Sequence, residues 1–180
     1  LEVIRALAET APGDAAFADR QAAAEALLVA AAGQHATFDA FFIYNAAGQV
    51  IAASDADRVG DDLAEHPFFT GSLAEARVNP VFHEGEDRVP VLLATQPILN
   101  AEGMVIGVVA GQMNLVPVDT IISQTAASTE LPVAIYMVSA AESRLVAPLE
   151  YAGLSGYPEL HSEGIDAGVA GQSGSGTYLN

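Results

Sequence analysis

The chain contains no cysteine, no lysine and no tryptophan among its 180 residues. Without cysteine the chain can form no disulfide, and it has no thiol that could act as a nucleophile or bind a metal. No apolar run reaches the roughly 20 residues that a membrane-spanning helix needs, because charged or polar residues interrupt each run. No signal peptide is evident and the first residue is not methionine, so we expect a fragment or processed product whose membrane anchors lie outside it.

Positive charge is scarce. All six basic residues are arginine, and the formal net charge is −17. Such an acidic surface repels phosphate backbones and anionic lipids, so we predict no nucleic-acid partner and no direct membrane contact. The arginine bias and the acidity fit either a high-GC genome or a halophilic source, and the composition leaves both open.

Sequence motifs of enzymes and metal sites are missing as well. There is no Gly-x-Ser-x-Gly elbow, Walker loop or dinucleotide fingerprint. The segment 55–60 begins like a calcium loop, but Val59 and His66 occupy positions where the loop needs oxygen ligands. We therefore predict no catalysis, no metal and no cofactor. A hydrolase would need a nucleophile–base pair that no motif indicates.

What the chain has is apolar patterning, with 51% hydrophobic residues, enough for a sizeable core. Helical spacing predicts a first helix over 1–11 and, after the Pro12-Gly13 break, a long alanine-rich helix over about 15–36. The apolar face of the long helix is marked by Phe17, Ala24, Leu27, Leu28 and Ala31.

The apolar pattern of residues 38–115 predicts one strand–helix–strand module. Strands within 39–54 and within 89–114, the latter over Val89 to Leu99 and Met104 to Asn114, should be antiparallel neighbours in one sheet, with the long helix packed on one face. A short helix beginning at Pro67 and ending near Ala76, and a strand over 79–83, should lie between these two hairpins.

The C-terminal part faintly repeats this order. We expect a helix from Pro117 to about Ser128. The other elements expected there are a strand over 133–138, its hairpin partner over 143–147, one or two helical turns over 165–170, a flexible tail over 171–176 and a strand stub over 177–179.

The order of these motifs resembles the membrane-distal module of double Cache sensor domains, which are PAS-like. The matching runs are FDAFFIYNAAGQVIAASD, VGDDLAEHPFF and VPVLLATQPILNAEGMVIGVVAGQMNL. Within them the family pattern is met by Asn45 to Gly48, Gly60 to Leu63, His66 to Phe69, Pro97-Ile98, Gly103 and Gly107 to Val109. The tryptophan-containing signature of the amino-acid-binding branch is absent.

The resemblance implies an α+β fold: an N-terminal helical segment (1–37), a membrane-distal PAS-like sensor module (38–130) and an incomplete membrane-proximal module (131–180). It also implies an extracytoplasmic ligand-sensing domain of a transmembrane histidine kinase, chemoreceptor or diguanylate cyclase of bacteria or archaea. The expected partner is a small metabolite, with a small carboxylate as one option. A homodimer is compatible with this interpretation.

We predict a small cavity between the sheet and a flap formed by residues 61–76. The residues expected to bind ligand are Tyr44, His66, Phe69, His83, Arg88 and Gln96. Arg88 would bind a carboxylate with its planar guanidinium. Structural alternatives stay open: a capping or surface role for His66, core packing for Phe69, backbone partners at a strand end for Tyr44 and Gln96, and the acidic neighbours Glu84, Glu86 or Asp87 as partners of Arg88.

Ligand binding would close the pocket and shift the population of a two-state receptor. The alternative function is a ligand-free structural or dimerisation module that relays a signal from a partner protein. The two hypotheses differ in the pocket, because a spacer should fill the gap between sheet and flap with large apolar side chains.

Overall fold

The computed structural model describes residues 2–128, 135–148 and 156–174. The chain forms two compact units. We call Leu1–Asn79 with Leu93–Asn114 the sheet unit, and Pro80–Leu92 with Leu115–Asn180 the C-terminal unit. The boundaries predicted at 37 and 130 concern sequence modules and stay a prediction. In the structure, the segment from Pro80 to Leu92 leaves the sheet unit and belongs to the C-terminal one.

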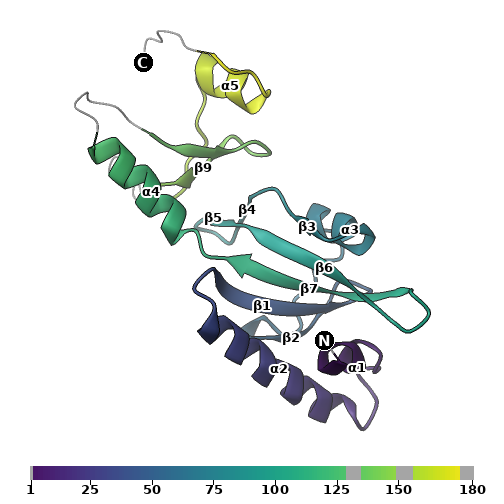
Figure 1. Ribbon diagram of the computed structural model, residues 1–180. Helices are drawn as coiled ribbons and strands as arrows, with labels where there is room; N and C mark the ends of the chain where they lie inside the picture. Colours follow the sequence, from purple (N-terminus) through teal and green to yellow (C-terminus); the bar gives the residue numbers. More distant parts are fainter. Residues whose placement is uncertain (1, 129–134, 149–155, 175–180) are drawn as a thin grey trace. The chain divides into compact units, whose positions relative to one another are not determined.

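The sheet unit is built on five antiparallel strands in the order β2-β1-β7-β6-β3. Their bounds are β1 (Phe38–Asn45), β2 (Val50–Ala53), β3 (Arg77–Val78), β6 (Leu93–Leu99) and β7 (Val105–Met113). The α+β class and the PAS-like antiparallel sheet predicted from the sequence are confirmed. Figure 1 shows the sheet with helices on both of its faces.

One face of this sheet is covered by α1 (Glu2–Ala8) and α2 (Phe17–Gln34). Ile4 and Leu7 from α1 pack in one cluster with Ala24 and Leu28 from α2 and with apolar residues of the sheet. The predicted packing of the long helix on the sheet is thereby confirmed. Leu27, expected on the same apolar face, is instead 42% exposed.

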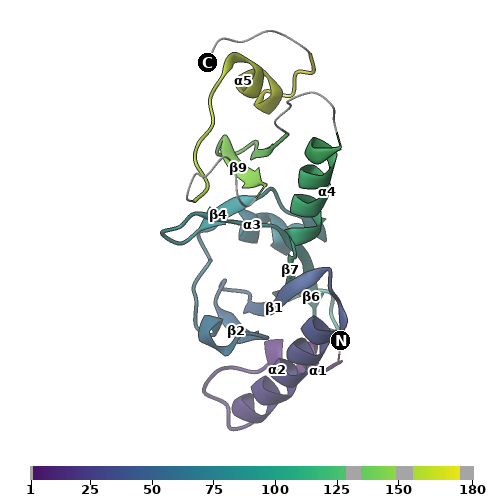
Figure 2. The same cartoon turned by 90° about the vertical axis from the view of Figure 1, so that its left-hand side faces the viewer.

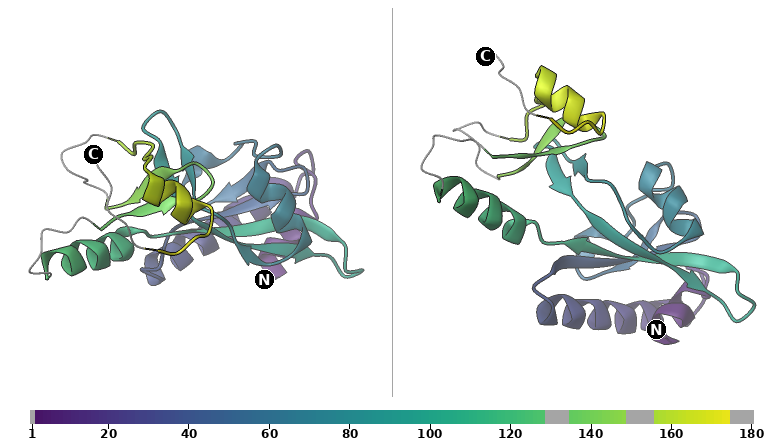
Figure 3. Two further views of the ribbon diagram at one scale, coloured as in Figure 1. Left: turned by 90° about the horizontal axis from the view of Figure 1, so that it is seen from above. Right: turned by 45° about the horizontal axis from the view of Figure 1, so that its top comes forward.

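The opposite face of the sheet carries α3 (Pro67–Ala74), as the right-hand view of Figure 3 shows. A 3₁₀ turn, η1 (Ala56–Arg58), precedes it. Strand alternation separates the two faces: Ile43 belongs to the cluster under α1 and α2, whereas its neighbour Tyr44 contacts the rings of α3. Both faces of β1 are therefore buried.

One predicted strand is wrong in part. Residues 89–99 do not form a single strand, because β5 (Val89–Val91) pairs with β4 (Phe82–Glu84) in a separate two-stranded sheet. Pro90 has no N–H to donate to a ladder, which favours an edge position for β5. The strand expected over 79–83 is also wrong in part, because only residues 82 and 83 lie in a strand, β4, whereas β3 ends before residue 79.

In the C-terminal unit, the β4–β5 hairpin lies beside a second hairpin, β8 (Met137–Ser139) and β9 (Arg144–Ala147), as Figure 2 shows for β4 and β9. Ser139 Oγ donates to Val81 O at 3.0 Å across this contact. The unit also contains α4 (Val116–Ala127) and α5 (Glu163–Val169). Of the strand expected over 133–138, residues 137 and 138 belong to β8, and residues 133 and 134 lie outside the described residues. The strand expected over 177–179 also lies outside them.

Glycine is required in the turn between β1 and β2. Gly48 has φ +90°, and a Cβ there would lie 2.5 Å from Ala64 Cα. We expect Gly48→Ala to destabilise the sheet unit by about 2–4 kcal/mol, since left-handed strain and backbone overlap add. Urea unfolding followed by circular dichroism measures the loss.

Gly103 provides the matched control. It also has a positive φ, +80°, but a Cβ there would meet nothing within 4 Å. Gly103→Ala should therefore cost only the backbone term, about 1–2 kcal/mol. Equal losses for the two variants would contradict the close approach at Ala64.

Candidate functional site

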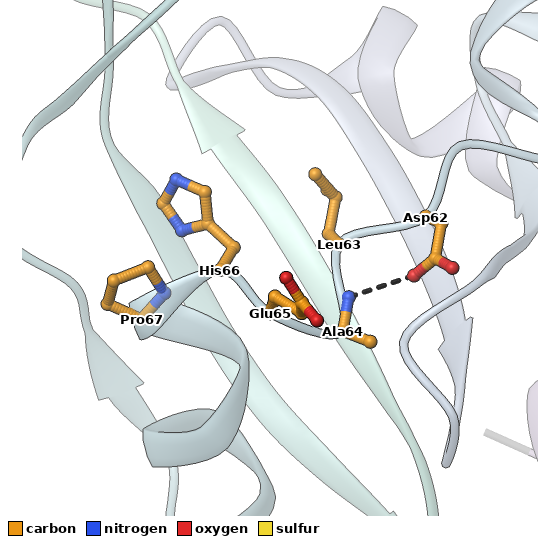
Figure 4. A pocket seen from close by; sticks show the side chains of 6 residues that line it. All are labelled: Asp62, Leu63, Ala64, Glu65, His66 and Pro67. Carbon is orange, nitrogen blue, oxygen red and sulfur yellow. Dashed lines mark hydrogen bonds between the residues drawn. The ribbon is translucent and has the colours of Figure 1, made fainter.

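The sheet unit contains a pocket of about 590 Å³ on the segment that leads into α3. Its lining residues are Asp62, Leu63, Ala64, Glu65, His66 and Pro67. Figure 4 shows these six side chains along the chain segment that enters α3. The pocket lies in the flap that the sequence predicted.

Hydrogen bonds hold this segment against the β1–β2 turn. The Asp62 carboxylate accepts from Ala64 N at 3.0 Å, drawn dashed in Figure 4. Leu63 N donates to Gly48 O at 3.0 Å. His66 precedes α3, and its Nδ1 accepts from Phe68 N at 3.5 Å, while Pro67 opens the helix. The capping role left open for His66 is therefore what the structure shows, and His66 is also one of the residues that line the pocket.

Aromatic rings fill the space between α3 and the sheet. The Tyr44 ring centroid lies 6.1 Å from that of Phe68 and 6.0 Å from that of Phe69. All three residues are at most 5% exposed. The structure thus brings Tyr44 and Phe69 together, as predicted, but as packed core. A ligand between α3 and the sheet would therefore have to displace these rings, whereas the segment 62–67 is open.

Gln96 does not share a face with Tyr44. In the ladder it opposes Val109, which opposes Ile43 and packs on the cluster under α1 and α2. Because directly opposed strand residues share a face, Gln96 points to the face that α1 and α2 cover. It cannot line one cavity with Tyr44, and its amide contacts Pro97 O at 3.4 Å.

His83 and Arg88 belong to the C-terminal unit. The His83 side chain is fully buried: Nδ1 contacts Glu142 Oε2, and Nε2 lies 2.9 Å from Leu145 O. The ring therefore joins β4 to the β8–β9 hairpin. This is a structural role that its position in an acidic turn did not reveal, because the partners lie about 60 residues further along the chain.

Arg88 is exposed and lies in the β4–β5 turn with φ 53°. Among the described residues it forms no ion pair with the acidic neighbours that the sequence offered as partners. It lines a shallow pocket of about 310 Å³ with Glu86, Asp87, Arg144, Gly156, Tyr157 and Pro158. Burial raises the pKa of the Tyr157 phenol above its ordinary value, and the Asp119 carboxylate raises it further.

The sequence analysis missed a buried polar cluster under α3. Ser72, Asn79 and Thr95 are 0%, 2% and 4% exposed, and hydrogen bonds connect all three. Arg77 is near this cluster along the chain, and its guanidinium lies against Gly71 of α3. Thr95 inside an apolar strand and Asn79 before a proline were the available signals, since buried polar groups need partners.

Among residues 2–128, 135–148 and 156–174, no group of three or more histidine, aspartate or glutamate side chains is arranged to hold a metal ion. Within the same residues, no helix combines the length and apolarity needed to cross a bilayer.

The fold is similar to that of several solved sensor domains. The sensor domain of Escherichia coli DcuS is 18% identical, with a TM-score of 0.51 over 68% of this chain and 84% of that domain. The sensor domain of the Vibrio cholerae histidine kinase DctB is also 18% identical, with a TM-score of 0.50 over 57% of this chain. This chain spans 41% of the length of the DctB domain.

A third similar structure is the ligand-binding domain of the Campylobacter jejuni chemoreceptor Tlp3, solved with 4-methylisoleucine. It is 12% identical, with a TM-score of 0.51 over 68% of this chain and 51% of that one. At these identities the comparisons establish the fold. No curated protein matches the chain.

Family membership rests on the sequence match. The model of single Cache domain 3 matches residues 1–124, more than two thirds of the chain. The chain belongs to this family and is a Cache sensor domain. The predicted Cache resemblance is confirmed at this level, and the double arrangement stays a prediction.

The buried histidine of the C-terminal unit gives a prediction about stability. His83→Ala should destabilise this unit by about 2–3 kcal/mol, because it opens a cavity and leaves Leu145 O without its partner. Hydrogen exchange at Leu145 and Val146 should accelerate accordingly.

His161→Ala is the matched control. The His161 side chain is 61% exposed and contacts Asp166 at 3.1 Å on the surface. Its removal should change stability by about 0.5 kcal/mol or less. A His83→Ala variant as stable as the control would show that the buried contacts contribute nothing.

Proposed function

We propose that this chain is the extracytoplasmic, non-catalytic input domain of a transmembrane receptor, and that it binds a small molecule at the pocket formed by residues 62–67. One observation carries the proposal: a pocket of about 590 Å³ on the flap of a Cache fold. Small-molecule sites typically have volumes of about 300–1,000 Å³. Whether the output is a kinase, a chemoreceptor or a cyclase depends on parts of the receptor other than these residues.

The charges at the pocket favour a ligand that carries an ammonium group. Asp62 and Glu65 contribute carboxylates, His66 contributes an imidazole, and no arginine is among the lining residues. The field of a chain with net charge −17 also attracts cations. The small carboxylate considered from the sequence depended on Arg88, which belongs to the other compact unit. The Tlp3 domain, whose fold is similar, was solved with an amino acid derivative.

A three-compound panel tests the charge of the ligand. Butane-1,4-diamine, 4-aminobutyrate and butanedioate share one carbon chain and differ only in their terminal charges. We expect the two amine-bearing compounds to raise the melting temperature, since binding to the native state stabilises it, and butanedioate to leave it unchanged. Thermal shift followed by calorimetry measures both effects.

Glu65→Gln tests the site itself. It should weaken binding of the amine by about 1 kcal/mol, or roughly fivefold, as expected for an exposed ion pair. Glu102→Gln, in the exposed β6–β7 turn, changes the net charge equally and should leave affinity unchanged. Stabilisation by butanedioate alone would reverse the charge assignment and direct attention to Arg77. No response to any of the three would count against an amine-bearing ligand of this size.

A second function is favoured by the aromatic packing. Tyr44, Phe68 and Phe69 fill the space between sheet and flap, which is what a ligand-free relay or dimerisation module requires. In this alternative, signals arrive from a partner protein. Sedimentation of the chain with and without each compound separates the two functions, because a ligand-free module should assemble independently of any of them.

The double Cache arrangement is also part of the proposal. The β8–β9 hairpin and α5 would begin a membrane-proximal module, and the DctB sensor domain, which this chain spans only in part, is long enough to hold more than one such unit. A longer chain that includes the following residues should show extra protected strands in hydrogen exchange.

A further inference from the structure

The buried cluster of Ser72, Thr95 and Asn79 lies where the chain leaves the sheet unit for the β4–β5 hairpin. Asn79 is the last residue before the crossing, and Leu93 is the first residue after the chain returns. Asn79 bonds to Leu93 O twice, through its backbone N at 2.8 Å and through Nδ2 at 3.2 Å. Asn79 thus joins the two chain segments that lead into and out of the β4–β5 hairpin, and we call Asn79 and Leu93 the hairpin root.

The same asparagine is connected to the flap. Its Nδ2 lies 3.0 Å from Thr95 Oγ1 on β6 and 3.4 Å from Ser72 Oγ on α3. The two hydroxyls lie 2.7 Å apart, and either can donate to the other. Helix, sheet and hairpin root therefore share one buried hydrogen-bond network.

This network has two self-consistent proton arrangements, because each hydroxyl has a single proton to donate. In the first, Ser72 donates to Phe68 O, 2.8 Å away at the pocket end of α3, and Thr95 donates to Ser72. In the second, Ser72 donates to Thr95, and Thr95 donates to Arg77 O, 3.3 Å away on β3. Moving from the first to the second removes the hydroxyl bond to Phe68 O near the start of α3 and adds one to Arg77 O on β3, two residues before Asn79.

An unsatisfied acceptor indicates that neither arrangement satisfies every group. Asn79 Oδ1 is buried and has no hydrogen-bond partner among the described residues. The amide cannot simply reverse, since Oδ1 would then take the place of Nδ2, 3.2 Å from Leu93 O, and two acceptors repel each other. An unpaired buried acceptor is energetically costly, so a rearrangement that gives it a partner would be stabilised.

The β4–β5 hairpin itself is bound to the β8–β9 hairpin of the same C-terminal unit. His83 contacts Glu142 and Leu145 O, and Val81 O accepts from Ser139. These contacts join the β4–β5 hairpin to the β8–β9 hairpin within the C-terminal unit.

We propose that the Ser72–Thr95–Asn79 cluster is the coupling element that passes movement of the flap at α3 through the β4–β5 hairpin to the C-terminal unit. This regulation rests on the proposed function, since α3 follows directly from the pocket segment. The residues act by position and do not need to touch a ligand. Coupling of this kind requires an element with two discrete arrangements, which the hydroxyl network supplies.

Hydrogen exchange on the ligand-free chain tests the coupling. Ser72→Ala removes the hydroxyl that α3 contributes. Exchange should become about threefold to tenfold faster in α3, in residues 82–84, at Val89 and Val91, and in β9, since one hydrogen bond shifts an opening equilibrium by that factor. Thr95→Val, which keeps the side-chain shape, should produce the same pattern from the sheet side and serves if Ser72→Ala does not fold.

Ser54→Ala is the control, because Ser54 Oγ accepts from Phe41 N at 3.0 Å elsewhere in the sheet unit. It should leave the β4–β5 hairpin and β9 unchanged. Acceleration confined to α3 in Ser72→Ala, or equal acceleration everywhere in both variants, would overturn the coupling. Because no ligand is added, failure of the three-compound panel would leave this result standing, and the reverse also holds.

Discussion

Burial of both faces of β1 is the constraint on which the sheet unit depends. Alternate residues of one strand must satisfy two different surfaces, so Ile43 packs beneath α1 and α2 while Tyr44 packs beneath α3. A register shift of one residue would exchange these surfaces and place every side chain on the wrong side. The neighbouring strand β7 alternates in the same way. Val109 lies on the face covered by α1 and α2, and Ala110 lies on the α3 face, where it pairs with Phe42 and Thr95.

Close approach in the middle of the sheet follows from this packing. A Cβ at Gly107 would lie 2.3 Å from Tyr44 O, and one at Gly111 would lie 2.7 Å from the Phe38 ring. Glycine normally weakens a strand. In β7 it makes room for the backbone and the aromatic rings of β1, so that the two strands can pair along their whole length. The two glycines of β7 are thus explained by β1: Gly107 by the Tyr44 carbonyl oxygen and Gly111 by the aromatic rings.

The region suited to signalling lies on the α3 face, opposite the α1 and α2 cluster. The face covered by α1 and α2 is an apolar core with few ways to rearrange. The α3 side combines an open pocket, packed aromatic rings and a buried polar network, and chain crossings to the C-terminal unit begin there at Asn79 and end at Leu93. Polar groups buried with alternative partners can switch between arrangements of similar energy, whereas an interdigitated apolar core resists small changes. A rigid side and a rearrangeable side in one small unit suit an input domain.

The sequence by itself determined the class of fold and the family, because strand alternation, helical spacing and the order of turn motifs are local properties. Segments such as 39–54 and 104–114 could be assigned from them. The flap and the proximity of Tyr44 to Phe69 could also be predicted, since both follow from the order of the elements. The sequence likewise excluded disulfides and thiolate sites by composition alone.

Only the tertiary structure decided which predicted site residues share a surface. Gln96 lies on the far face of the sheet from Tyr44, and His83 and Arg88 belong to a unit that their position between two sheet strands did not indicate. The partners of His83 lie at Glu142 and Leu145, and those of Ser72 lie at Asn79 and Thr95. Burial and hydrogen bonding between distant segments depend on how elements pack, and one chain pattern allows many such pairings. The polar network under α3 is therefore a product of the folded chain, which brings a helix, a strand and a hairpin root to one place.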